Sequence, residues 1–135
     1  MSSSGREVSK QEIIDMAKRM IKAFKNIQCF VFERDEIHVV RKVIDEVGLS
    51  RLVRIGRADK RYPYIYIVKP NLNPFMKECS DKAEKTILEG RVREEYKKQF
   101  RIEYIRQCLN HYEHERVKEI IGLLEKYLRE HGVGE

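Results

Sequence analysis

Basic and tyrosine side chains are interleaved along residues 51–70 of this chain. The segment carries a single carboxylate, on Asp59. Its cations are Arg51, Arg54, Arg57, Lys60, Arg61 and Lys69. Tyr62, Tyr64 and Tyr66 stand at every second position, which places three phenol rings on one face of an extended strand. Cations hold phosphates, and exposed rings stack on bases or pack against sugars. The pattern predicts a nucleic-acid-binding surface at 51–70.

The charge of the rest of the chain is nearly balanced. The 135 residues carry 28 Lys and Arg against 22 Asp and Glu, a formal net charge of +6 at pH 7. Residues 1–50 and 71–135 together supply only one unit of it, so almost all the excess lies in 51–70. This asymmetry favours a polyanion partner, because each cation that neutralises a phosphate releases counterions. The alternative is a solvated basic loop whose tyrosines pack beneath helices.

An arginine and a histidine are separated by four residues in Arg106-Gln107-Cys108-Leu109-Asn110-His111. This spacing resembles the R-x4-H element of the HEPN ribonucleases, which are all-helical domains of about this size. The resemblance implies that Arg106 and His111 would activate a ribose hydroxyl and stabilise charge on the phosphate. A HEPN-like ribonuclease is therefore one alternative to a binding protein.

Two further clusters contain metal-ligating side chains. Cys108, His111 and His114 recur at steps of three, which spreads them across a helix surface instead of directing them at one ion. No closely spaced pair of cysteines accompanies them, as a structural zinc site would need. The acidic run at 33–36 suits the start of a helix. We therefore expect no metal, no cofactor and no intrinsic nuclease activity.

Apolar spacing predicts the elements that position the basic segment. Ser9 and Glu12 form a capping box, and a helix over 10–26 follows it. The short apolar run at 28–32 indicates a buried strand. A second helical stripe runs from Ile37 to Val47 and ends at Gly48, a typical C-cap residue.

Residues 49–70 are compatible with two structures. In one, Gly48-Leu49-Ser50 is the turn of a helix-turn-helix and 51–58 form a short recognition helix. In the other, 52–55 and 64–69 are the strands of a hairpin with its turn at 58–61. Alternation favours the hairpin. It predicts a core face of Val53, Ile55, Ile65 and Ile67, and an outward face of Arg54, Tyr64 and Tyr66.

Residues 75–131 contain no proline and are rich in helix formers, with interruptions expected at Gly90 and Asn110 and an end at Gly132. The strongest apolar stripe lies on the final helix. It consists of Val117, Ile120, Ile121, Leu124, Tyr127 and Leu128. Because a sheet of two or three strands offers little area to cover it, we predict a homodimer interface at Val117, Ile120, Ile121, Leu124 and Leu128. Coverage by the chain's own sheet is the alternative.

The predicted fold is α+β, with a winged-helix-like part at 9–70 followed by helices at 75–131. Residues 1–8 are expected to be a disordered leader, and 9–135 a single domain. No apolar run approaches the length of a membrane span, and the N-terminus has no secretion signal. Three widely spaced cysteines then indicate free thiols in the cytoplasm.

The prediction for function is a small, cytoplasmic nucleic-acid-binding protein that acts as a homodimer or as a subunit of an assembly. The winged-helix order favours DNA slightly over RNA. A protein–protein adaptor that docks through the C-terminal helices is the first alternative, and the ribonuclease is the second. Abundant Lys, Arg and Glu with no Trp is a composition common in thermophile proteins.

Overall fold

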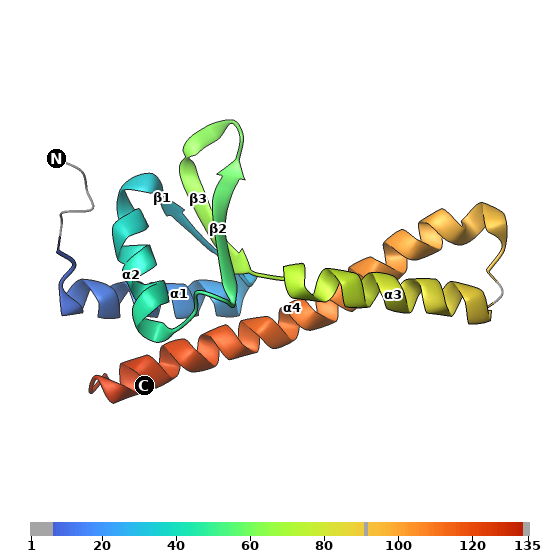
Figure 1. The fold of residues 1–135 in the computed structure, drawn as a ribbon. Helices are drawn as coiled ribbons and strands as arrows, with labels where there is room; N and C mark the ends of the chain where they lie inside the picture. The colour runs from blue at the N-terminus through green and yellow to red at the C-terminus, as the bar shows by residue number, and fades with distance from the viewer. Residues whose placement is uncertain (1–6, 91, 134–135) are drawn as a thin grey trace. The chain divides into compact units, whose positions relative to one another are not determined.

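The computed structural model describes residues 7–90 and 92–133. Its elements are α1 (Lys10–Ile27), β1 (Phe30–Glu33), α2 (Ile37–Val47), β2 (Val53–Asp59), β3 (Tyr62–Pro70), α3 (Asn73–Gly90) and α4 (Lys97–Glu130), with single-turn 3-10 helices at Arg34–Glu36 and Glu94–Tyr96. The three strands form an antiparallel sheet in the order β1-β3-β2 (Figure 1). The predicted α+β class and element order are confirmed. Residues 1–6 of the predicted leader lie outside the described residues.

The chain divides into two compact units, one of which is built from two separate stretches of sequence. The sheet unit contains the residues up to 70 and those from 117 onward, and the helical unit contains 71–116. The long helix α4 contributes its N-terminal part to the helical unit and its C-terminal part to the sheet unit.

The helix ends of the sheet unit follow from residues that the sequence singles out. Ser9 accepts a hydrogen bond from the backbone N–H of Glu12 (3.1 Å), and the Glu12 carboxylate accepts one from the N–H of Ser9 (3.0 Å). The predicted capping box is therefore confirmed. Gly48 ends α2 at φ 86°, in the left-handed region that glycine adopts without strain.

The predicted recognition helix at 51–58 is wrong. Residues 49–52 form a turn, in which the N–H of Leu52 donates to the carbonyl of Leu49 (2.8 Å), and β2 begins at Val53. Leu49 is fully buried, so the chain is anchored in the core directly after α2 ends. The hairpin alternative is confirmed, with a two-residue turn at Lys60 and Arg61.

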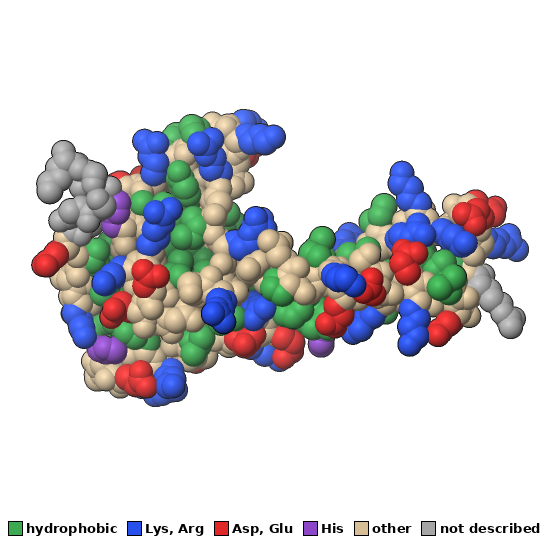
Figure 2. All heavy atoms as spheres, viewed as in Figure 1, with side chains coloured by type: hydrophobic (Ala, Val, Ile, Leu, Met, Phe, Trp, Pro, Cys, Tyr) green, Lys and Arg blue, Asp and Glu red, His purple; other side chains and the backbone are tan. Residues whose placement is uncertain are grey.

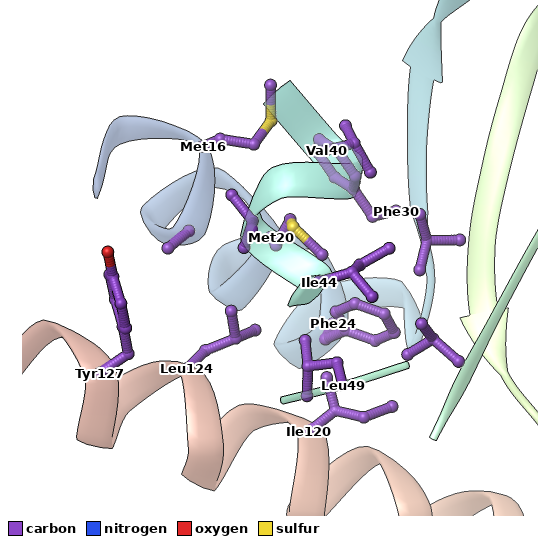
Figure 3. Close-up of a cluster of buried hydrophobic side chains, with 14 of the residues drawn as sticks. Met16, Met20, Phe24, Phe30, Val40, Ile44, Leu49, Ile120, Leu124 and Tyr127 are labelled. Carbon is purple, nitrogen blue, oxygen red and sulfur yellow. The ribbon is translucent and has the colours of Figure 1, made fainter. Parts of the chain in front are cut away.

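The core of the sheet unit lies between one face of the sheet and helices α1, α2 and the C-terminal part of α4 (Figure 3). Met20 and Phe24 from α1, Leu49 from the turn, and Ile120 and Leu124 from α4 are completely buried in it. Burying one side chain of this size stabilises a fold by about 1.5–3 kcal/mol. The helices therefore hold the sheet firmly, and with it the base of the hairpin.

The apolar stripe of α4 belongs to this same core. Val117, Ile120, Leu124 and Leu128 are buried there, and Ile121 packs against it as a partly buried side chain. The stripe is therefore covered by other side chains of the same chain, which is the alternative to a dimer interface. A homodimer through these five residues stays a prediction.

The helical unit contains α3 and the N-terminal part of α4, and a covalent bond links these two helices. Cys79 of α3 and Cys108 of α4 form a disulfide with their Cα atoms 5.8 Å apart, so the expectation of free thiols is wrong for these two residues. Cys29 is not disulfide-bonded. The antiparallel return of the chain brings together cysteines that are 29 positions apart in sequence.

The two interruptions predicted in the C-terminal half have different outcomes. Gly90 ends α3, as expected. Asn110 interrupts nothing, because α4 runs unbroken from Lys97 to Glu130. The low helix propensity of a single asparagine costs well under about 1 kcal/mol, which tertiary packing readily overcomes. Phe75 of α3 stacks on Tyr112 close to that position, with ring centroids 4.2 Å apart.

Candidate nucleic-acid interface

The far end of the hairpin extends beyond the third strand. The ladder between β1 and β3 runs from Phe30↔Val68 to Glu33↔Ile65 and stops there. The ladder between β2 and β3 continues to Asp59↔Tyr62. Residues 57–64, which we call the hairpin tip, begin where Arg57 pairs with Tyr66 beside Phe32 of β1, and beyond that pair they form a two-stranded ribbon that projects past β1 (Figure 1).

The tyrosines share one face of β3, but it is the core face of the sheet. Tyr66 is the partner of Phe32, with ring centroids 5.9 Å apart, and packs against the core. Val68, two positions further on, is completely buried. The predicted facing of β3 is therefore wrong, because Ile65 and Ile67 alternate with these residues and lie on the opposite face. Successive side chains of a strand point to opposite faces of the sheet. A prediction that is wrong by one position therefore assigns every side chain of the strand to the wrong face.

Tyr62 and Tyr64 follow on the same strand beyond the edge of the core, where the ladder shifts register between the pairs Arg57↔Tyr66 and Asp59↔Tyr62. The two residues are 47% and 51% exposed, and their rings form an edge-to-face pair with centroids 6.4 Å apart. Arg57 is the partner of Tyr66 across the ladder and therefore faces the same way as Tyr66. The hairpin tip thus presents two uncovered rings, with a cation at its base.

The cations of the hairpin tip differ in their partners. Arg57 and Lys60 are exposed, and neither makes an ion pair within the described part of the chain. Arg61 is bound to Asp59 by its guanidinium (Nη2 to Oδ2 2.9 Å, Nε to Oδ1 3.2 Å) and by its backbone N–H (2.9 Å). Arg57 and Lys60 therefore carry the uncompensated charge of the tip.

The pair of Asp59 and Arg61 was not anticipated from the sequence. Hydrogen bonds from the Arg61 side chain and backbone hold the pKa of Asp59 below its usual range, and the same pair raises the pKa of Arg61. The sequence does contain a local signal for this pair. In a turn, an aspartate carboxylate readily accepts a hydrogen bond from the backbone N–H of the residue two positions later, as Asp59 does from Arg61. The Arg61 guanidinium also lies 5.7 Å from the centre of the Tyr62 ring.

The remaining predicted cations lie at the base of the hairpin. Arg54 and Lys69 are partners across the ladder, on the sheet face opposite the core, and both are exposed. Arg51 is exposed in the turn that precedes β2. The predicted site is therefore divided between the hairpin tip and the base. Figure 2 shows Lys and Arg side chains gathered at the far end of the hairpin.

Arg106 and His111 are not brought together. Both lie on α4, where five positions correspond to a rotation of about 140° around the helix axis. The guanidinium of Arg106 binds the carboxylate of Glu103 (2.7 and 2.5 Å), and His111 packs edge-on against Tyr112 (5.6 Å). The two side chains therefore do not converge on one phosphate.

The other titratable clusters also have structural roles. Glu36 of the acidic run forms an ion pair with Arg19 of α1 (2.5 Å), which lowers the pKa of Glu36. The sulfur of Cys108 is bonded to Cys79, so it is not a thiolate ligand. Within residues 7–90 and 92–133, no three His, Cys, Asp or Glu side chains lie close enough together to hold a metal ion.

Comparison with protein-family models, curated proteins and solved structures gave no match. Among the described helices, none combines the length and the apolar character needed to traverse a lipid bilayer.

Proposed function

We propose that this protein binds nucleic acid through the hairpin tip, with Arg57 and Lys60 as its main phosphate contacts. The observation that carries the proposal is the state of these two cations. They are exposed and have no ion pair within the described residues; Lys60 stands in the turn of the ribbon that projects past β1, and Arg57 stands at the base of that ribbon.

The position of the charge supports a phosphate partner. Residues 51–70 hold nearly all of the net charge of +6, and the buried core at the base of the hairpin holds this segment in place. A projecting basic ribbon reaches a polyanion without rearrangement of the core. Each cation that neutralises a phosphate also releases counterions, so binding gains free energy at low salt and loses it as salt rises.

The test is the salt dependence of binding by Arg57→Ala/Lys60→Ala. The slope of log affinity against log salt should become shallower by about two units, roughly one for each lost contact. Folding should be unchanged, because surface substitutions alter stability by less than about 0.5 kcal/mol. Lys85→Ala/Lys98→Ala in the helical unit is the matched control, because it removes the same charge from exposed positions that are not part of the hairpin.

Asp59→Asn tests the same surface in the opposite direction. Removing the carboxylate releases the guanidinium of Arg61, so this variant should bind nucleic acid more tightly than the parent protein and with a steeper salt slope. If the Arg57/Lys60 variant and its control bind with the same affinity and slope as the parent, the hairpin tip is not the phosphate-binding surface.

A protein–protein adaptor is the second candidate, and one apolar groove favours it. Leu72, Ile102, Ile105 and Leu109 line a groove of about 490 Å³ in the helical unit, and Ile102 is 59% exposed. A partner docked in this groove would stay bound at high salt and would be insensitive to Arg57→Ala/Lys60→Ala. Those two results together would favour the adaptor over nucleic-acid binding.

A further inference from the structure

We infer that the nucleic acid bound at the hairpin tip is single-stranded, with its unpaired bases stacked on Tyr62 and Tyr64. This inference rests on the proposed function and names its substrate class. The first support comes from the way the hairpin is connected. The chain passes from α2 through the turn at 49–52 directly into β2, so among the described residues no recognition helix is inserted between α2 and the hairpin to enter a major groove.

The second support is the contrast among the three tyrosines of β3. Tyr66 packs against Phe32 and the core, which accounts for its place in the sequence. Tyr62 and Tyr64 follow on β3 past the core, and about half of each residue is exposed to water. Two exposed aromatic side chains at a projecting ribbon are not explained by folding, and they offer ring surface that bases stack on.

The third support is the closeness of rings and cations along the hairpin tip. Arg57 faces the same way as Tyr66, at the base of the tip, and Lys60 lies in the turn that precedes Tyr62. A single strand presents phosphates and unpaired bases along its length, so it can contact cations and rings together. In a duplex the base faces are already stacked on one another, so the tyrosine rings cannot stack on them.

The experiment compares three probes of equal length on the full chain: oligothymidylate, an abasic strand with the same phosphates, and a duplex. The parent protein should bind oligothymidylate more tightly than either other probe. Tyr62→Ala/Tyr64→Ala should lose on the order of tenfold in affinity per ring for oligothymidylate. The same variant should bind the abasic strand as the parent does.

Two controls separate stacking from other effects of the substitutions. Tyr62→Phe/Tyr64→Phe keeps both ring faces and should bind oligothymidylate as the parent does. Tyr96→Ala removes an exposed tyrosine of the helical unit and should change nothing. Loss of affinity in the phenylalanine variant would assign the contact to the hydroxyl groups and overturn stacking.

Absence of base stacking and absence of nucleic-acid binding would give different results with these probes. Equal affinity for oligothymidylate and the abasic strand, with a salt slope that still depends on Arg57 and Lys60, would overturn base stacking and leave phosphate binding intact. Tighter binding of the duplex than of the single strand would also overturn it. If none of the three probes binds at low salt, the proposed function itself fails.

Discussion

The sheet unit and the helical unit are stabilised in different ways. The sheet unit buries apolar side chains from three helices and three strands in one cluster. In the described part of the helical unit, only Cys79, Ala83 and Ile87 are buried apolar residues. The helical unit instead has a disulfide, a ring stack and an ion pair between its helices, the last formed by Glu84 and Arg101.

This difference follows from the number of layers that each unit can build. Helices packed on a sheet enclose a core, whereas two helices have only the strip along which they touch. A small core supplies little stabilisation, and small units commonly compensate with covalent links. The unit that carries the candidate site therefore depends on apolar packing, and the other depends on its cross-link.

Leu124→Ala should have the largest effect, and it should fall on the sheet unit. The side chain is completely buried, so its truncation should lower the free energy of unfolding of that unit by about 2–5 kcal/mol. Urea unfolding followed by NMR signals from both units measures the loss. Leu88→Ala, at an 82% exposed position of the helical unit, is the control. An equal loss in both variants would mean that burial does not distinguish the units.

Cys79→Ala/Cys108→Ala should destabilise the helical unit by about 3 kcal/mol, because the link closes a loop of 29 residues in the unfolded chain. Amide hydrogen exchange should accelerate along α3 and remain slow along α1. Reductant added to the parent protein should reproduce this result, while Cys29→Ala should leave exchange unchanged. Slow exchange of α3 without the link would show that helix packing alone maintains the unit.

Glu36→Gln should have the smallest effect, less than about 1 kcal/mol at neutral pH, because the ion pair with Arg19 is partly exposed. Arg19 lowers the pKa of Glu36 in the folded state. The pair therefore stabilises the sheet unit fully above the ordinary carboxyl pKa, and this contribution is lost as pH falls through the lowered value.

Stability measured against pH should show the parent and Glu36→Gln converging in acid. Glu89→Gln, at an exposed position of the helical unit, should follow the parent at every pH. A constant difference between parent and Glu36→Gln across this range would mean that Glu36 does not act through its charge.

Local signals in the sequence predict most of the sheet unit. The capping box at Ser9 and the glycine at Gly48 act within one helical turn, so their effect is visible in the sequence itself. The facing of β3 is harder to predict, since Ile65 and Tyr66 are both large and apolar enough to face a core. The side chains on the neighbouring strands determine which face of β3 packs on the core: Phe32 lies opposite Tyr66, and Ile55 lies opposite Val68. Such pairing is a property of the assembled sheet.

Composition locates the basic segment but does not reveal how its side chains pair. The excess charge marks 51–70 as basic, and the pairing of Arg61 with Asp59 leaves Arg57 and Lys60 as the uncompensated cations of the hairpin tip. The disulfide was missed for a similar reason. The distance between Cys79 and Cys108 depends on how α3 and α4 return past each other, and no local pattern encodes it.

The disulfide also determines how the molecule would respond to mechanical force. Tension applied at the two ends of the chain passes through the bond between Cys79 and Cys108 and bypasses the residues between them. The 29-residue separation corresponds to about 100 Å of fully extended chain. A pulling trace of the oxidised protein should fall short of the reduced protein by about that contour length. The helical unit is therefore largely shielded from the pull, and the sheet unit yields first.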